Sequence, residues 1–140
     1  HTSTVPVSYL SGIDLVRDAV NDDLIGEFIK KAMFEDIIPT LDFDREELEG
    51  FAEKILERFK NPFIDHKWLD ISLNSTSKFK TRVLPSLIKY IEQSNELPDR
   101  LVFSLAALIT FYKGTEIRNN KLIAYRDGEE YQINDDLEAL

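Results

Sequence analysis

Residues 44–59, DREELEGFAEKILERF, carry the clearest fold signal in the chain. Asp44 followed three residues later by Glu47 is typical of a helix start with a capping box. Pro62 lies just beyond the stretch and ends it. The apolar residues recur at spacings of three and four, which places them on one face of an α-helix: Leu48, Phe51, Ala52, Ile55, Leu56 and Phe59. We therefore predict an amphipathic helix here.

Helical patterning extends to both sides of this stretch. Residues 24–33 form a second amphipathic run, which Asp22 caps and Pro39 closes. Pro6 is placed where the first turn of a helix tolerates it. A further helix is expected over residues 66–73.

Two later segments differ from this amphipathic pattern. Residues 101–112 are nearly all apolar, and a helix that is hydrophobic on every side is usually central and buried. Residues 122–126 and 129–133 flank Asp127 and Gly128, a strong two-residue signal for a β-hairpin. The fold class we predict is all-α, a single mainly helical domain over residues 1–140, with one small surface hairpin near its C-terminus.

Composition limits the classes of partner. A chain of 140 residues with 43% hydrophobic residues can build one real core. Its net charge of −9 argues against nucleic-acid or anionic-membrane binding, and no apolar run approaches the length of a membrane span. The absence of cysteine removes disulfides and thiolate metal sites, and it fits a reducing compartment. We expect a cytoplasmic protein with no nucleic-acid partner and no membrane partner.

Basic side chains gather in residues 75–85, STSKFKTRVLP. Pro85 fits only the first turn of a helix, so the helix is expected to begin near Thr81 and to run to about residue 93. Helix starts attract anions, yet Lys78, Lys80 and Arg82 collect at this one. One interpretation is an anion site for a ligand carboxylate or phosphate. The other is that these cations are solvated or pair with nearby acids.

The remaining candidates carry little signal by themselves. His1 and His66 have no spacing that suits a zinc site, and His66 is typical of a surface or capping residue. The chain has no glycine-rich dinucleotide loop, no phosphate-binding loop and no serine-nucleophile elbow. Acidic pairs such as Asp135–Asp136 sit at expected helix starts and turns, where capping explains them.

Three segments together resemble one known family: residues 1–6 (HTSTVP), residues 58–66 (RFKNPFIDH) and residues 77–85 (SKFKTRVLP). They resemble the C-terminal domain of the polyol-specific long-chain dehydrogenases, the mannitol dehydrogenase family. The third segment looks most like the tagaturonate reductase (altronate oxidoreductase) branch. In order and spacing the three cover most of the chain.

The resemblance implies a helical substrate domain like that of the 6-phosphogluconate dehydrogenase-like enzymes, next to an N-terminal Rossmann domain that binds NAD. His1 matches the last position of the family motif Lys-x-x-x-x-Asn-x-x-His, in which the Lys is the general acid/base. The resemblance implies a catalytic His1 and substrate contacts from Lys78, Lys80, Arg82 and His66. It implies no cofactor-binding or metal-binding residue in this stretch. The extra cations fit a uronate carboxylate.

We therefore expect a C-terminal fragment of an NADH-dependent reductase that converts the keto-uronate tagaturonate to altronate. Its partners would be the sugar acid and its own Rossmann domain. Since the motif Lys, the motif Asn and the dinucleotide domain lie outside the chain, the fragment alone is expected to be inactive. Within the same family the substrate could instead be fructuronate, mannitol or mannitol 1-phosphate. An alternative of another class is a non-catalytic helical interaction domain.

Overall fold

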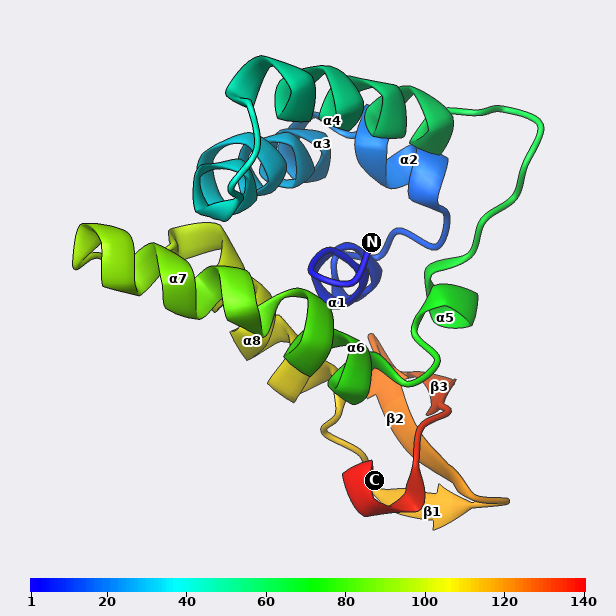
Figure 1. The fold of residues 1–140 in the computed structure, drawn as a ribbon. Coiled ribbons are helices and arrows are strands. Elements are labelled where there is room, and N and C mark those ends of the chain that lie inside the picture. The colour runs from blue at the N-terminus through cyan, green and yellow to red at the C-terminus, as the bar shows by residue number, and fades with distance from the viewer.

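Helix α1 (Val5–Leu10) lies at the centre of the computed structural model, which describes residues 1–140 (Figure 1). Two groups of helices lie on either side of it, and a small sheet lies at the C-terminal end. The first group is α2 (Val16–Asn21), α3 (Asp23–Lys31) and α4 (Arg45–Phe59). The second group is α6 (Ser75–Arg82), α7 (Leu84–Ser94) and α8 (Asp99–Phe111). The short helix α5 (Trp68–Ile71) and α8 both pack against α1.

The two amphipathic helices begin where their sequences predict. The Asp22 side chain accepts hydrogen bonds from the backbone N–H groups of Leu24 and Ile25 at 3.0 and 2.9 Å. The Asp44 side chain accepts from the N–H of Glu47 at 3.3 Å. Both predictions are confirmed, because a cap needs only the residues of the first turn. After α3 the chain continues as a π-helical turn, η1 (Ala32–Ile37), and a 3₁₀ turn, η2 (Ile38–Thr40).

The main core surrounds α1. It joins helices from both groups to the sheet, and its largest members are the fully buried Trp68, Phe111, Ile29 and Ile133. A second core lies between α6, α7 and α8 and consists of Phe79, Val83, Leu87, Leu101 and Leu108. The second core fixes α6 against α7 and α8, so it determines where the basic side chains of α6 stand.

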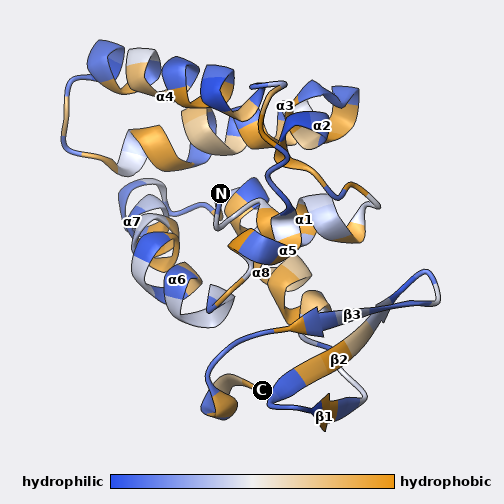
Figure 2. Ribbon diagram, turned by 90° about the vertical axis from the view of Figure 1, so that its right-hand side faces the viewer, coloured by the Kyte–Doolittle hydropathy of each residue, from blue (hydrophilic) through white to orange (hydrophobic).

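The C-terminal hairpin is present with its predicted turn, but it is not a surface feature. Strands β2 (Lys121–Arg126) and β3 (Glu129–Ile133) pair antiparallel, and Asp127 and Gly128 have φ of 50° and 82°. Leu122, Ile123 and Ala124 are buried, and β2 is largely hydrophobic in Figure 2. The prediction of a surface hairpin is wrong because Leu122 and Ala124 of β2 pack into the main core. A third strand, β1 (Glu116–Arg118), pairs with β2 and was not predicted, because it is only three residues long and exposed.

Helix α8 is less buried than its composition predicts. Its inner face contributes Leu101, Leu108 and Phe111 to the cores, but Phe103 is 58% and Ile109 is 61% exposed. The prediction of burial on every side is therefore wrong, because helices cover only one side of α8. None of the helices is both long and apolar enough to cross a membrane.

A carboxylate far away in the sequence caps α8. Pro98 precedes this helix and has no side chain that could accept from its free N–H groups. Asp36, in the π-helical turn, accepts instead from the N–H groups of Arg100 and Leu101 at 3.0 and 3.1 Å. It also pairs with the Arg100 guanidinium at 3.2 Å. The side chain of Asp36 is fully buried, so this contact ties the first group of helices to the second.

Candidate functional site

The basic stretch forms a helix of its own, α6, and the predicted helix start near Thr81 is wrong. Thr81 lies in the last turn of α6, where its hydroxyl donates to the Ser77 carbonyl at 3.0 Å. The next helix, α7, begins at Leu84 with Pro85 in its first turn, as Pro85 alone predicts. Lys80 and Arg82 therefore lie in the last turn of a helix, where the partial negative charge of free carbonyl groups favours them. The helix-start argument for an anion site does not hold.

The three cations of α6 point in two directions. Lys78 and Arg82 are four residues apart and share one face of the helix, whereas Lys80 stands on another. Lys80 lines a shallow hollow with Pro85 and Ile88. The Lys78 ammonium donates to the Ile71 carbonyl at 2.9 Å, so one of its three N–H groups is hydrogen-bonded to the end of α5. None of the three cations forms an ion pair with an acidic side chain.

The two histidines lie together. Their ring centroids are 5.8 Å apart and their planes nearly perpendicular, at 89°. The His1 ring also stacks on Phe59 at 4.2 Å and meets the edge of Trp68 at 6.2 Å. Both histidine residues are exposed, whereas Trp68 is fully buried. The two imidazoles are therefore accessible, and that of His1 rests against the aromatic rings of Phe59 and Trp68.

The backbone around each histidine is fixed by local hydrogen bonds. The His1 carbonyl accepts from the Thr4 hydroxyl and amide, both at 2.9 Å, and from the Val5 amide at 3.0 Å. The His66 carbonyl accepts from the Val16 amide at 2.9 Å. These bonds tie His1 to the first turn of α1 and His66 to the start of α2, so both rings project from anchored backbone.

Arg82 shares its face of α6 with Lys78, whose ammonium contacts the end of α5. Helix α5 begins with Trp68, and the Trp68 ring meets the His1 ring at 6.2 Å. The basic face of α6 and the histidine pair therefore both border α5. Arg82 is exposed and Lys78 is half-buried. The arrangement combines two imidazoles with a free guanidinium, a combination that can bind a small anionic molecule bearing hydroxyl or carbonyl groups.

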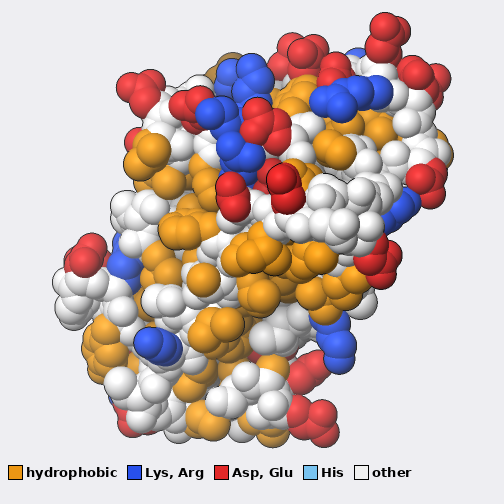
Figure 3. All heavy atoms as spheres, turned by 90° about the vertical axis from the view of Figure 1, so that its left-hand side faces the viewer, with side chains coloured by type: hydrophobic (Ala, Val, Ile, Leu, Met, Phe, Trp, Pro, Cys, Tyr) orange, Lys and Arg blue, Asp and Glu red, His pale blue; other side chains and the backbone are white.

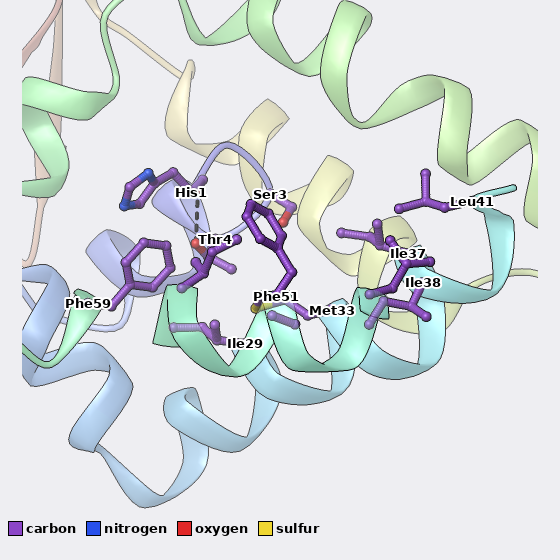
Figure 4. Close-up of a pocket in the computed structure, with 13 residues that line it drawn as sticks. His1, Ser3, Thr4, Ile29, Met33, Ile37, Ile38, Leu41, Phe51 and Phe59 are labelled. Carbon is purple, nitrogen blue, oxygen red and sulfur yellow. Dashed lines mark hydrogen bonds between the residues drawn. The ribbon is translucent and has the colours of Figure 1, made fainter. Parts of the chain in front are cut away.

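An apolar groove of about 240 Å³ opens beside His1. Figure 4 shows His1 and Phe59 at one end of the groove and Leu41 at the other. Side chains of α3, η1 and α4 form its walls, among them Ile29, Met33 and Phe51. On the face shown in Figure 3, hydrophobic side chains gather in the middle of the molecule, between charged groups above and below.

Sequence reasoning missed the contributions of Phe59 and Trp68. The sequence places Phe59 only on the apolar face of a predicted helix, yet its ring stacks on His1. The indole N–H of Trp68 is buried without a hydrogen-bond partner. The available signal was the closeness of both residues in sequence to His66, with Phe59 ending α4 and Trp68 opening α5.

The chain itself offers no cofactor cradle. Its only sheet is antiparallel, in the order β1-β2-β3, so it lacks the strand–helix–strand unit that holds a dinucleotide. No group of three or more His, Cys, Asp or Glu side chains is placed to hold a metal ion.

Comparisons with known proteins agree on one family. The family described as "Mannitol dehydrogenase C-terminal domain" matches residues 1–139. An altronate oxidoreductase of Halalkalibacterium halodurans is 46% identical over all 140 residues, which are 27% of its length. One of Pectobacterium atrosepticum is 54% identical over 114 residues, which are 81% of this chain and 23% of the relative. The chain thus spans about a quarter of the length of these curated relatives.

Among solved structures, the mannitol 2-dehydrogenase of Pseudomonas fluorescens, in a ternary complex with NAD and D-mannitol, has a similar fold. The TM-score is 0.75 at 23% sequence identity, over 98% of this chain and 27% of that one. At this identity the likeness concerns the fold alone.

Proposed function

Because this chain belongs to the mannitol dehydrogenase C-terminal domain family, we propose that it forms the substrate-binding part of a longer NAD-dependent oxidoreductase. The reaction we propose interconverts tagaturonate and altronate. Two relatives that support it are named altronate oxidoreductase and are 46% and 54% identical to the chain. The mannitol 2-dehydrogenase of similar fold is described in complex with NAD.

The observation that carries the choice of substrate is the position of Arg82. Its guanidinium is exposed and makes no internal ion pair, and Lys78 on the same helix face contacts the end of α5, the helix whose Trp68 meets the His1 ring. A planar guanidinium binds a carboxylate through two parallel hydrogen bonds. A uronate carries such a carboxylate a few carbons away from its carbonyl. We place the substrate carboxylate at Arg82 and the reacting carbonyl at His1.

Lys78 and His66 complete the proposed contacts. Lys78 shares the Arg82 face of α6. One of its N–H groups donates to the Ile71 carbonyl, and the other two are available to a ligand. His66 meets the His1 ring at its edge, so it borders the same space. We assign Lys78 a second contact to the carboxylate and His66 a contact to a substrate hydroxyl. Lys80 has no part in this arrangement, because it faces another hollow.

His1 would act by hydrogen bonding. Its imidazole would bind the carbonyl oxygen or the neighbouring hydroxyl and so orient the carbonyl carbon. The stack on Phe59 restricts rotation of the ring. The nicotinamide, when bound, supplies or accepts the hydride. Since this chain has no dinucleotide cradle, we place the cofactor site and the general acid elsewhere in the longer protein. The 140-residue chain alone is accordingly proposed to be inactive, and NADH turnover by it would contradict this.

The experiment that tests the substrate assignment uses the longer protein. NADH oxidation is measured with tagaturonate, fructuronate and fructose, for the wild type and for the Arg82→Ala and Lys78→Ala variants. Loss of a charge-assisted pair costs about 1.5–3 kcal/mol, so we expect Arg82→Ala to raise KM for tagaturonate by roughly 10- to 100-fold. Fructose has no carboxylate and should be unaffected. Preference for fructuronate would favour the nearest alternative, and equal effects on all three substrates would refute the carboxylate contact.

A further inference from the structure

Helix α6 lacks a cap from its own sequence. The residue before it, Asn74, has a left-handed backbone with φ of 56° and makes no side-chain capping bond. The Ser75 hydroxyl donates to the Ser72 carbonyl and therefore points back along the chain. The Ser75 amide donates to the Ser72 carbonyl at 3.1 Å, but the next amide, that of Thr76, has no acceptor in its own turn, and an unsatisfied N–H group is costly.

Asp135 supplies the missing acceptor from 59 residues away. One of its carboxylate oxygens, Oδ2, accepts from the Thr76 hydroxyl at 2.8 Å and from the Thr76 amide at 3.3 Å. The same oxygen accepts from the Tyr112 hydroxyl at the end of α8. The other oxygen, Oδ1, accepts from the Asp136 amide at 2.8 Å. Next to this contact, the Asn74 amide donates to the Asn134 carbonyl at 3.1 Å.

The carboxylate is bound in its charged form. Burial acts to raise the pKa of Asp135, but the hydrogen bonds from Tyr112 and Thr76 outweigh it and lower the pKa below the ordinary value. Burial and the same hydrogen bond raise the pKa of Tyr112, so the phenol stays protonated and keeps donating. A negative charge at the start of α6 is also favoured by the helix dipole.

We propose that Asp135 is a positioning residue for the substrate site, because it fixes the helix that carries Lys78 and Arg82. This inference rests on the proposed function. Helix α6 is eight residues long, and we treat it as a rigid rod. The rise from Thr76 to Arg82 is about 9 Å, and the Arg side chain adds about 6 Å. A tilt of about 10° at the N-terminal end of α6 would therefore move the guanidinium by about 2.5 Å, enough to break a two-bond contact with a carboxylate.

The test measures KM and kcat for tagaturonate in the longer protein. Asp135→Asn removes the charge, and Thr76→Val removes the hydroxyl at nearly constant volume. We expect each to raise KM by about three- to tenfold while kcat stays within about twofold of the wild type. Asp136→Asn is the matched control, because Asp136 is the exposed neighbour and makes no side-chain cap. If Asp135→Asn does not fold, Thr76→Val carries the test.

A double-mutant cycle with Arg82 separates positioning from a general structural role. If Asp135 acts through Arg82, Asp135→Asn adds little to KM in the Arg82→Ala background. An undiminished effect in that background, or a fall in kcat with KM unchanged, would overturn the positioning role. The Arg82→Ala variant alone distinguishes failure of this inference from failure of the proposed function. A large KM effect of Arg82→Ala with none from Asp135→Asn leaves the proposed function standing and refutes this inference. No effect from Arg82→Ala refutes both.

Discussion

Replacement of Asp36 by alanine is expected to destabilise the fold strongly. Asp36 is 1% exposed and accepts from two backbone amides at the start of α8 and from the Arg100 guanidinium. Each buried N–H group left without a partner costs about 1–1.5 kcal/mol. Arg100 loses less, because Glu35 still pairs with it at 2.8 Å. The sum is about 2–4 kcal/mol, which exceeds the roughly 0.5–2 kcal/mol that the loss of an ordinary helix cap costs.

Urea unfolding followed by circular dichroism measures this loss. Asp42→Ala is the matched control, because Asp42 is 89% exposed in its side chain and pairs only with Lys89 at 3.0 Å. That variant should change the free energy of unfolding by less than about 0.5 kcal/mol. The Asp36→Asn variant keeps the shape of the side chain, so its loss in free energy of unfolding should lie between those of Asp36→Ala and Asp42→Ala. If Asp36→Ala proves no more destabilising than Asp42→Ala, the remote cap contributes nothing and the account of how α8 is held is refuted.

Three further predictions concern stability. The pKa of Asp135 is lower in the folded than in the unfolded chain. The ionised carboxylate therefore stabilises the fold at pH values above its unfolded pKa, and this stabilisation is lost as the pH falls through its folded pKa. As the pH falls from about 5 to about 3, the difference in the free energy of unfolding between the wild type and Asp135→Asn should therefore shrink. A difference that stays constant over this range would contradict the lowered pKa. Gly26→Ala puts a Cβ 2.3 Å from the Val20 carbonyl oxygen and should cost about 2–4 kcal/mol. Gly50→Ala meets nothing within 4 Å and should stabilise α4 by about 0.5–1 kcal/mol, as thermal melts would show.

The sequence predicts those parts of the fold whose causes are local. Asp22 and Asp44 cap helices through amides two or three residues away, and both caps are confirmed. The turn at Asp127 and Gly128 is likewise decided by two residues that adopt positive φ. The helical fold class with a C-terminal hairpin is confirmed for the same reason.

Features that depend on distant residues could not be predicted. Asp36 and Asp135 cap α8 and α6 from 64 and 59 residues away, and no periodicity marks such pairs. Helix α6 was not predicted as a helix of its own because its cap is remote, and Pro85 favoured a single helix that begins near Thr81. The meeting of His1 and His66 also needs the tertiary fold. The family resemblance supplied the candidate residues, and the structure then separated Lys80 from Lys78 and Arg82.

The most direct test of the central claim compares Arg82→Ala with Lys80→Ala in the longer protein. Both variants remove one positive charge from α6, but the two side chains stand on different faces of the helix. The measurement is kcat/KM for tagaturonate at fixed ionic strength. We expect a fall of roughly tenfold or more for Arg82→Ala and almost none for Lys80→Ala. Equal losses in the two variants would mean that only the net charge of the helix matters, and would contradict a carboxylate site at Arg82.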